Sequence, residues 1–198
     1  MNLWNGDLKE ILQNPYALAM APGFFRVYAH VGVMHAMEEA GVLHPVSVSG
    51  SSAGAMSAGF YASGLKPSEM INDILAINRE AIWDPAISFL GSGLGYLKGF
   101  QLRKCINDKL LHKTFNKTRI PLGMSAYNIF KLGTELLYDG DIATNMCASA
   151  CFPILFNPVI INNLPYIDAG LSDCYGMMAL PCLPDDAVGN SNSNSNNN

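Results

Sequence analysis

The sequence predicts an α/β domain with a mostly parallel central sheet. In the first half of the chain, short apolar runs alternate with stretches of helical spacing, which favours parallel strands joined by helices. The chain has 198 residues, enough for one domain with a substantial core. Hydrophobic residues make up 49% of it and charged residues only 14%, so we expect a large apolar interior and some apolar surface.

The first half of the chain is predicted to hold two strand-to-helix units and a further helix. The first strand ends before a turn at Pro22 and Gly23, and its helix stops at Gly41, because glycine commonly ends a helix. The second strand leads directly into a helix rich in small residues. In order, these elements are predicted over residues 16–21, 27–40, 45–49 and 53–61 and from residue 67 onward.

The second half is predicted to combine helices with paired strands. Residues 81–100 are apolar and rich in glycine, which suggests a loop over the core. A hairpin-like turn is expected at Asn162 and Asn163, between two short apolar runs. Helices are predicted over residues 101–113 and 142–150, and strands over 122–130, 134–138, 159–161 and 165–167.

One folded domain is expected over residues 15–183, after an N-terminal extension of residues 1–14. Residues 184–198 are rich in Asn and Ser, which cannot build a core, so we expect a disordered tail. The first residues lack the basic start and apolar core of a signal peptide, and no stretch reaches the apolar length of a membrane span. We therefore expect a cytoplasmic protein, with peripheral membrane association as a further option.

Charge and cysteine content exclude some classes of function. The net charge of −4 makes the chain a poor nucleic-acid binder, so no nucleic-acid partner is expected. Five cysteines form no C-x-x-C pair, and an odd number without a secretion signal favours free thiols. Cys147 and Cys151 are expected to be buried small residues rather than metal ligands, since no histidine lies nearby in the sequence.

The most informative local pattern is G-x-S-x-G over residues 50–54, between a predicted strand and a predicted helix. Gly50 and Gly54 flank the serine because so tight a turn tolerates no side chain beside it. Ser52 would then lie at a helix N-terminus, where free N–H groups and the helix dipole favour developing negative charge. Ser52 is the candidate nucleophile, and a glycine-rich turn without chemistry is the alternative.

Ser52 needs a base that accepts its proton. All four histidines precede Asp168, and the Ser–acid–His order of an α/β-hydrolase would have to fit into the helical middle of the chain. Asp168 ends a predicted strand, and the small residues after it let its carboxylate approach another backbone closely. Two interpretations stay open from the residues alone: a Ser-Asp dyad of Ser52 and Asp168, or a turn-capping role for Asp168.

Several ordered motifs resemble those of the patatin-like phospholipases. Besides G-x-S-x-G, they are RVYAHVGVM at 26–34 with EEAG at 38–41, GLGYL at 93–97, RIPL at 119–122, ASACFP at 148–153 and YIDAG at 166–170. The resemblance covers nearly all of residues 15–183 and implies a patatin-like three-layer sandwich. It also implies acyl-ester hydrolysis of a phospholipid or lysophospholipid through a dyad of Ser52 and Asp168, of the phospholipase A or lysophospholipase type, with no metal or other cofactor.

The loop after the first strand departs from the pattern of that family. The family has G-G-G-x-R-G, whose N–H groups hold the oxyanion, whereas residues 22–27 here read PGFFRV. Pro22 has no N–H to donate, so Gly23 and Phe24 are the best candidates for the oxyanion hole. Arg26 either supplies positive charge near the oxyanion or a lipid phosphate, or is a solvated residue of the first helical turn.

The altered loop keeps rival functions open. A catalytically weak or inactive patatin-like module that binds lipid or protein is one alternative. A small-ester hydrolase or an acyltransferase acting through the same dyad is another. The segment after Gly170 also departs from the family, because DCYG at 173–176 replaces its usual Asn-x-Pro ending.

A basic segment lies near the middle of the chain. Seven of the twelve Lys and Arg residues lie between Lys98 and Arg119, where Asp108 is the only acidic residue. The predicted helix in this segment follows the apolar stretch 82–97, which contains Trp83 and Tyr96. Basic charge beside exposed aromatic rings suits an anionic membrane surface. An ordinary solvated helix face beside a buried loop is the alternative.

Overall fold

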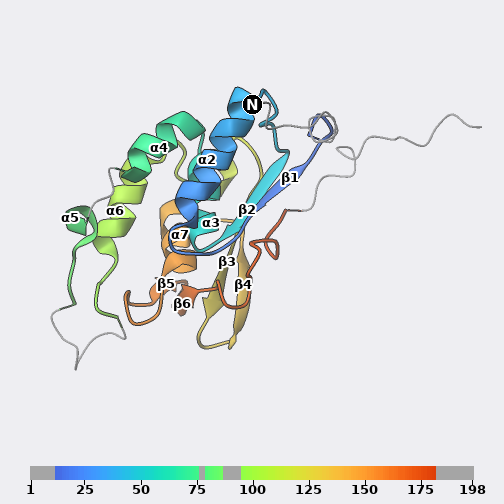
Figure 1. Ribbon diagram of the computed structural model, residues 1–198. Helices are drawn as coiled ribbons and strands as arrows, with labels where there is room; N and C mark the ends of the chain where they lie inside the picture. The colour runs from blue at the N-terminus through green and yellow to red at the C-terminus, as the bar shows by residue number, and fades with distance from the viewer. Residues whose placement is uncertain (1–11, 76–78, 87–94, 182–198) are drawn as a thin grey trace, which may run out of the picture.

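The computed structural model describes residues 12–75, 79–86 and 95–181, and Figure 1 shows how their elements are arranged. The predicted extension and tail therefore fall largely outside the described residues. The helices are α2 (Arg26–Glu39), α3 (Ala53–Ala62), α4 (Pro67–Leu75), α5 (Arg79–Ile82), α6 (Phe100–Lys109), the short 3-10 helix η1 (Phe115–Lys117) and α7 (Ile142–Ala150). The strands are β1 (Ala17–Met20), β2 (Ser47–Ser51), β3 (Leu122–Asn128), β4 (Gly133–Leu137), β5 (Val159–Ile161) and β6 (Leu164–Asp168).

These strands form one sheet in the order β1-β2-β3-β6-β5, with β4 also paired to β3. β1, β2 and β3 are parallel, as expected for strands joined by helices. The strands that follow pair antiparallel, β4 and β6 with β3 and β5 with β6. The α/β class is confirmed, and the parallel part of the sheet is the part built from the first half of the chain.

One edge of β3 is shared by two strands. β4 pairs with residues 124–128 of β3 along one edge, so β2 and β6 must both lie along the other. β2 runs parallel to β3 and ends with Ser51 opposite Ser125, whereas β6 runs antiparallel and ends with Asp168 opposite Ala126. The carboxyl ends of β2 and β6 therefore meet head to head beside two consecutive residues of β3.

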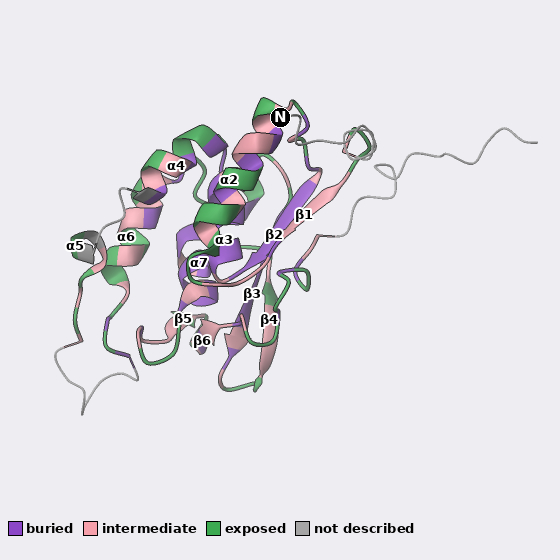
Figure 2. Cartoon of the chain, viewed as in Figure 1, coloured by how far each residue is buried: buried purple, intermediate pink, exposed green. Residues whose placement is uncertain are grey.

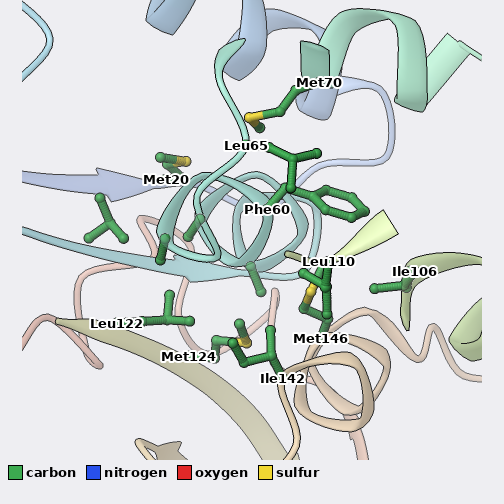
Figure 3. Close-up of a cluster of buried hydrophobic side chains, with 14 of the residues drawn as sticks. Met20, Phe60, Leu65, Met70, Ile106, Leu110, Leu122, Met124, Ile142 and Met146 are labelled. Carbon is green, nitrogen blue, oxygen red and sulfur yellow. The ribbon is translucent and has the colours of Figure 1, made fainter. Parts of the chain in front are cut away.

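The longer helices lie on one side of the sheet (Figure 1). α3 and α7 pack against the strands, and α2, α4 and α6 pack against these two helices or against one another. α3 is buried almost all round, because alanines and glycines allow the neighbouring backbones to approach it closely. The buried core between these layers includes Phe60, Met124 and Met146, and it appears as a cluster of side chains in Figure 3.

The opposite face of the sheet carries polar side chains. Along β2, Ser49 and Val48 point to opposite faces, as strand geometry requires. The Ser49 hydroxyl donates to the Gly176 carbonyl at 2.5 Å, and the Ser125 hydroxyl donates to the buried Asp173 carboxylate at 2.8 Å. Within the described residues, the third layer of the sandwich is therefore the segment 169–181, which contains no helix.

Figure 2 shows how burial follows this arrangement. The strands β2 and β3, which lie between the two outer layers, are buried along most of their length, whereas β4 is only partly covered. None of the helices among the described residues is both long enough and apolar enough to cross a bilayer.

Two predicted elements end earlier than expected, because tertiary and side-chain hydrogen bonds intervene. The helix predicted to Lys113 stops at Lys109, and the His112 N–H instead donates to the Ser63 carbonyl. The strand predicted over 122–130 stops at Asn128, whose side-chain oxygen accepts from the N–H groups of Phe130 and Lys131. The turn made by these side-chain hydrogen bonds takes the place of further strand pairing after Asn128. Residues 87–94 of the predicted apolar loop lie outside the described residues.

Two helical glycines should respond in opposite ways to the same substitution. A Cβ on Gly54 would lie 1.9 Å from the Met20 carbonyl oxygen, so we expect Gly54→Ala to lower the free energy of unfolding by about 1–3 kcal/mol or more. A Cβ on Gly32 would meet nothing within 4 Å, so Gly32→Ala should raise it by about 0.5–1 kcal/mol. Urea unfolding followed by circular dichroism measures both, and equal stability of the two variants would contradict this packing of α3 on β1.

Candidate functional site

Ser52 lies in a strained turn between β2 and α3. Its backbone has φ 53° and ψ −117°, a conformation that costs a non-glycine residue about 1–3 kcal/mol. The flanking glycines make the turn sterically possible, since a Cβ on Gly50 would lie 2.2 Å from the backbone of Gly54. Ser52 lies directly before the first residue of α3 and is half-buried.

The structure brings Ser52 and Asp168 together. The Ser52 hydroxyl donates to Asp168 Oδ2 at 2.6 Å, although the two residues are 116 positions apart in the sequence. The head-to-head arrangement of β2 and β6 accounts for this contact, because Ser52 follows the last residue of β2 and Asp168 is the last residue of β6. A hydroxyl donating to a carboxylate in this way is the geometry of a nucleophile with its general base.

Asp168 is held by further hydrogen bonds. The Gly170 N–H donates to its Oδ1 at 2.7 Å, and its own N–H donates to the Cys151 carbonyl at 3.0 Å. Burial raises the pKa of the Asp168 carboxyl, while the Ser52 and Gly170 hydrogen bonds partly lower it. A raised pKa makes the carboxylate a better proton acceptor than an exposed aspartate.

The loop with Gly23 and Phe24 lies beside this carboxylate. A Cβ on Gly170 would lie 2.9 Å from both Pro22 Cβ and Asp168 Oδ1, which places the two loops against each other. Gly23 takes φ +135°, which favours glycine, whereas Phe24 keeps a negative φ and projects a ring that is 71% exposed. Neither Gly23 nor Phe24 uses its N–H for a hydrogen bond to the described residues. Both N–H groups are therefore available to a ligand.

Arg26 folds back onto the same loop. Its Nη1 donates to the Pro22 carbonyl at 2.9 Å, and its backbone N–H donates to the Gly23 carbonyl at 2.7 Å. The side chain also lies across Gly23, because a Cβ there would meet Arg26 Cδ at 2.8 Å. Arg26 thus braces the loop as well as placing a positive charge next to it.

Other titratable groups near the site have structural contacts. His30 lies between α2 and α3 with Nδ1 3.4 Å from the Ser57 hydroxyl, and burial followed by the charge of Arg26 lowers its pKa. Burial raises the pKa of both Cys147 and Cys151 to about 12, so these thiols stay protonated. As expected from the sequence, both cysteines are buried.

The loops around the dyad expose apolar side chains. Phe24 and Phe25 stack edge to face, and Leu171 follows directly after the Asp168 loop. Within residues 20–28, 150–156 and 169–180, the one exposed charged residue is Arg26. The exposed large apolar residues of these segments are Phe24, Phe25, Tyr28, Phe152, Ile154, Leu171, Tyr175, Met177 and Met178, which we call the apolar rim.

Ser149 is a residue at this site to which sequence reasoning gave no role. Its hydroxyl accepts a hydrogen bond from the Ser52 N–H at 2.9 Å, and its side chain is fully buried on α7. The sequence around it, Ala148-Ser149-Ala150, indicates only a small-residue helix. No periodicity could have shown which buried serine of the chain faces Ser52.

Comparison with known proteins agrees with this architecture. A model of the patatin-like phospholipase family matches residues 18–180. Among solved structures, VipD from Legionella pneumophila matches with a TM-score of 0.52 and 16% sequence identity, over 80% of this chain and 46% of the VipD chain. At this identity the likeness to VipD concerns the fold, and it confirms the expected α/β architecture. The chain covers less than half of the length of VipD.

The hydrogen bond between Ser52 and Asp168 should be visible in the titration of the carboxyl group. We expect the pKa of Asp168 to lie above the usual aspartate value of about 3.9 and to rise further in Ser52→Ala, because the hydroxyl stabilises the ionised form. Carbon-13 NMR of the labelled carboxyl measures both values. Ser63→Ala, which removes a buried hydroxyl that donates to the Phe60 carbonyl, is the control and should leave the titration unchanged.

Proposed function

Because this chain belongs to the patatin-like phospholipase family, we propose that it hydrolyses acyl esters of phospholipids or lysophospholipids through Ser52 and Asp168. The observation that carries this proposal is the 2.6 Å hydrogen bond from the Ser52 hydroxyl to Oδ2 of the half-buried Asp168 carboxylate. A serine in a strained elbow, joined to a base of raised pKa, has the features of an activated nucleophile.

The reaction follows from the positions of these groups. Ser52 Oγ attacks the acyl carbonyl carbon while Asp168 accepts the hydroxyl proton. Asp168 then returns this proton to the leaving alcohol, and the acyl group remains on Ser52 as an ester. A water molecule that loses a proton to Asp168 attacks the acyl-enzyme, and the fatty acid leaves as Ser52 regains its proton.

The negative charge on the carbonyl oxygen needs hydrogen-bond donors. The free N–H groups of Gly23 and Phe24 are next to the Asp168 loop, and Arg26 braces their loop and adds positive charge. The bulky Phe24 is not strained in this loop, because Gly23 rather than Phe24 takes the positive φ. A single oxyanion donor contributes about a hundredfold or more in rate. Since this loop offers two N–H donors, these observations favour an active enzyme over an inactive module.

A lipid substrate fits the surroundings of the dyad. The apolar rim offers contact to acyl chains, and Arg26 is the one exposed charged residue of the segments that carry this rim. The described mouth of the site has no exposed carboxylate that would repel a phosphate. This chemistry suits an ester with a long apolar chain and an anionic head group.

Removal of either member of the dyad should abolish ester hydrolysis. We expect Ser52→Ala and Asp168→Asn to lower kcat on a short p-nitrophenyl ester and on a lysophospholipid by roughly a thousandfold or more, because each removes a group that bonds directly to the reacting atoms or proton. Ser63→Ala is the matched control and should keep wild-type turnover. Equal turnover in Ser52→Ala and wild type would refute the assignment.

If the protein is instead an inactive lipid-binding module, the wild type should not hydrolyse esters. An active Ser52 reacts with a fluorophosphonate, and Ser52→Ala does not. A folded wild-type protein that neither turns over esters nor takes up the label, yet binds lipid vesicles, would establish the module instead. Transfer of the acyl group to an added alcohol in preference to water would identify an acyltransferase.

We further propose that the protein attaches peripherally to an anionic membrane through the start of α6. Lys98, Arg103 and Lys104 are exposed there, next to the exposed ring of Phe100. The Arg103 guanidinium lies 6.0 Å from the centre of that ring. Two other cations of the basic segment have partners within the protein, which makes them less available to a membrane. Lys109 pairs with Asp73 at 2.5 Å, and Arg119 donates to the Gly64 carbonyl.

This basic surface is connected to the mouth of the site. The Tyr96 N–H donates to the carbonyl of Ile154, a member of the apolar rim, at 2.8 Å. The Asp84 carboxylate accepts from the N–H groups of Gly99 and Gln101, which fixes the beginning of α6. A membrane that contacts the start of α6 would therefore lie close to the part of the apolar rim at Ile154.

Reversal of two charges at the start of α6 should weaken vesicle binding. We expect the double variant Lys98→Glu/Lys104→Glu to lose co-sedimentation with anionic vesicles, because each cation near such a surface contributes about 1 kcal/mol. The control, Lys113→Glu/Lys117→Glu, makes the same charge change at exposed residues beyond the end of α6 and should bind nearly as wild type. Equal binding of wild type to anionic and neutral vesicles would exclude this surface.

A further inference from the structure

The carboxyl end of α7 contacts the backbones of both members of the dyad. The Ser52 N–H donates to Ser149 Oγ at 2.9 Å, and the Asp168 N–H donates to the Cys151 carbonyl at 3.0 Å. Ser149 and Cys151 are two positions apart, at the last turn and the C-cap of the helix. A single rigid turn thus reaches the nucleophile on one side and the base on the other.

The Ser52 N–H depends on a side-chain acceptor because of its place in the chain. The pairing of β2 with β3 ends at Ser51, and α3 begins at Ala53, so Ser52 lies between the ladder and the helix. Its backbone takes a positive φ, which neither a strand nor an α-helix has. Ser149 Oγ supplies the acceptor from a position that is fully buried. An N–H left without a partner in such a place costs free energy, and the backbone relaxes to avoid that cost.

We propose that Ser149 is a positioning residue that fixes the backbone of Ser52 so that its hydroxyl stays directed at Asp168. This inference rests on the proposed Ser-Asp hydrolysis, and it adds a role for a residue that touches neither the substrate nor the transferred proton. The Cys151 carbonyl accepts from the backbone of the base at the same turn, so α7 holds the backbones of both catalytic residues in the places where the sheet brings them together.

The bond also removes the Ser52 N–H from the groups that could hold the oxyanion. Since the Ser52 N–H is committed to Ser149, it does not point its hydrogen at a substrate carbonyl. The N–H groups of Gly23 and Phe24, which donate to none of the described residues, remain the proposed donors to the developing charge. Ser149 therefore separates the anchoring of the nucleophile from the stabilisation of the oxyanion.

If Ser149 only stabilised the fold, its contribution would come from the packing of α7. α7 packs on the sheet and on α3 through buried apolar residues such as Ile142 and Met146, which a change at Ser149 does not remove. The positioning role instead belongs to one oxygen atom. It can be tested with a variant that deletes this oxygen and one that keeps it.

Ser149→Ala should lower kcat on a soluble p-nitrophenyl ester by about tenfold to a hundredfold with little change in KM, because small displacements of a reacting group are costly. It should also raise the pKa of Asp168, in the direction of Ser52→Ala, as the Ser52 hydroxyl leaves the carboxylate. Ser149→Thr, which keeps the hydroxyl oxygen, should restore most of the rate. Ser63→Ala, an equally buried serine with a hydrogen bond of its own, should change neither measurement.

Two outcomes overturn the proposal. One is a folded Ser149→Ala protein with wild-type kcat and an unchanged Asp168 titration. The other is a loss in Ser149→Thr as large as that in Ser149→Ala, which would assign the effect to packing. If the wild type hydrolyses no ester, the proposed function fails separately, and the Asp168 titration in Ser149→Ala still shows whether Ser149 holds Ser52 in place.

Discussion

The shared edge of β3 is the constraint on which the candidate site depends. β2 and β6 approach each other along this edge from opposite directions, and their ends meet between Ser125 and Ala126. The side chains that follow and end these strands, Ser52 and Asp168, are thereby brought to 2.6 Å. Because backbone ladders hold both strands, the separation of the two groups is set by the geometry of the sheet rather than by flexible loops.

Contacts from both faces of the sheet also hold the chain around the ends of β2 and β6. The serine-rich face of β2 and β3 bonds to residues 173–176, so the chain that leaves Asp168 is bound back onto the sheet. On the helical side, the last turn of α7 bonds to the backbones of Ser52 and Asp168. The positive φ of Ser52 is maintained by these contacts together, in keeping with the view that strain at a site persists only where its surroundings fix it.

In the loop of residues 22–27, a bulky residue stands where the family pattern has glycine, and the backbone accommodates it. Gly23 alone takes the conformation that favours glycine, and Phe24 keeps an ordinary backbone while its ring projects outward. Arg26 holds the Pro22 carbonyl, so the loop is braced by a side chain where the family has more glycine. The exposed rings of Phe24 and Phe25 then become part of the apolar rim.

The sequence by itself determined the α/β class, the approximate bounds of most elements, and the G-x-S-x-G turn with Ser52 at its centre. These depend on local periodicity and on the steric needs of a few glycines, which are written in neighbouring residues. It could not determine that Asp168 meets Ser52, because this contact requires that β6 run antiparallel along an edge already used by β2. Nor could it single out Ser149 among the buried serines or foresee the early end of α6, since both depend on hydrogen-bond partners distant in sequence that only the packed chain brings within reach.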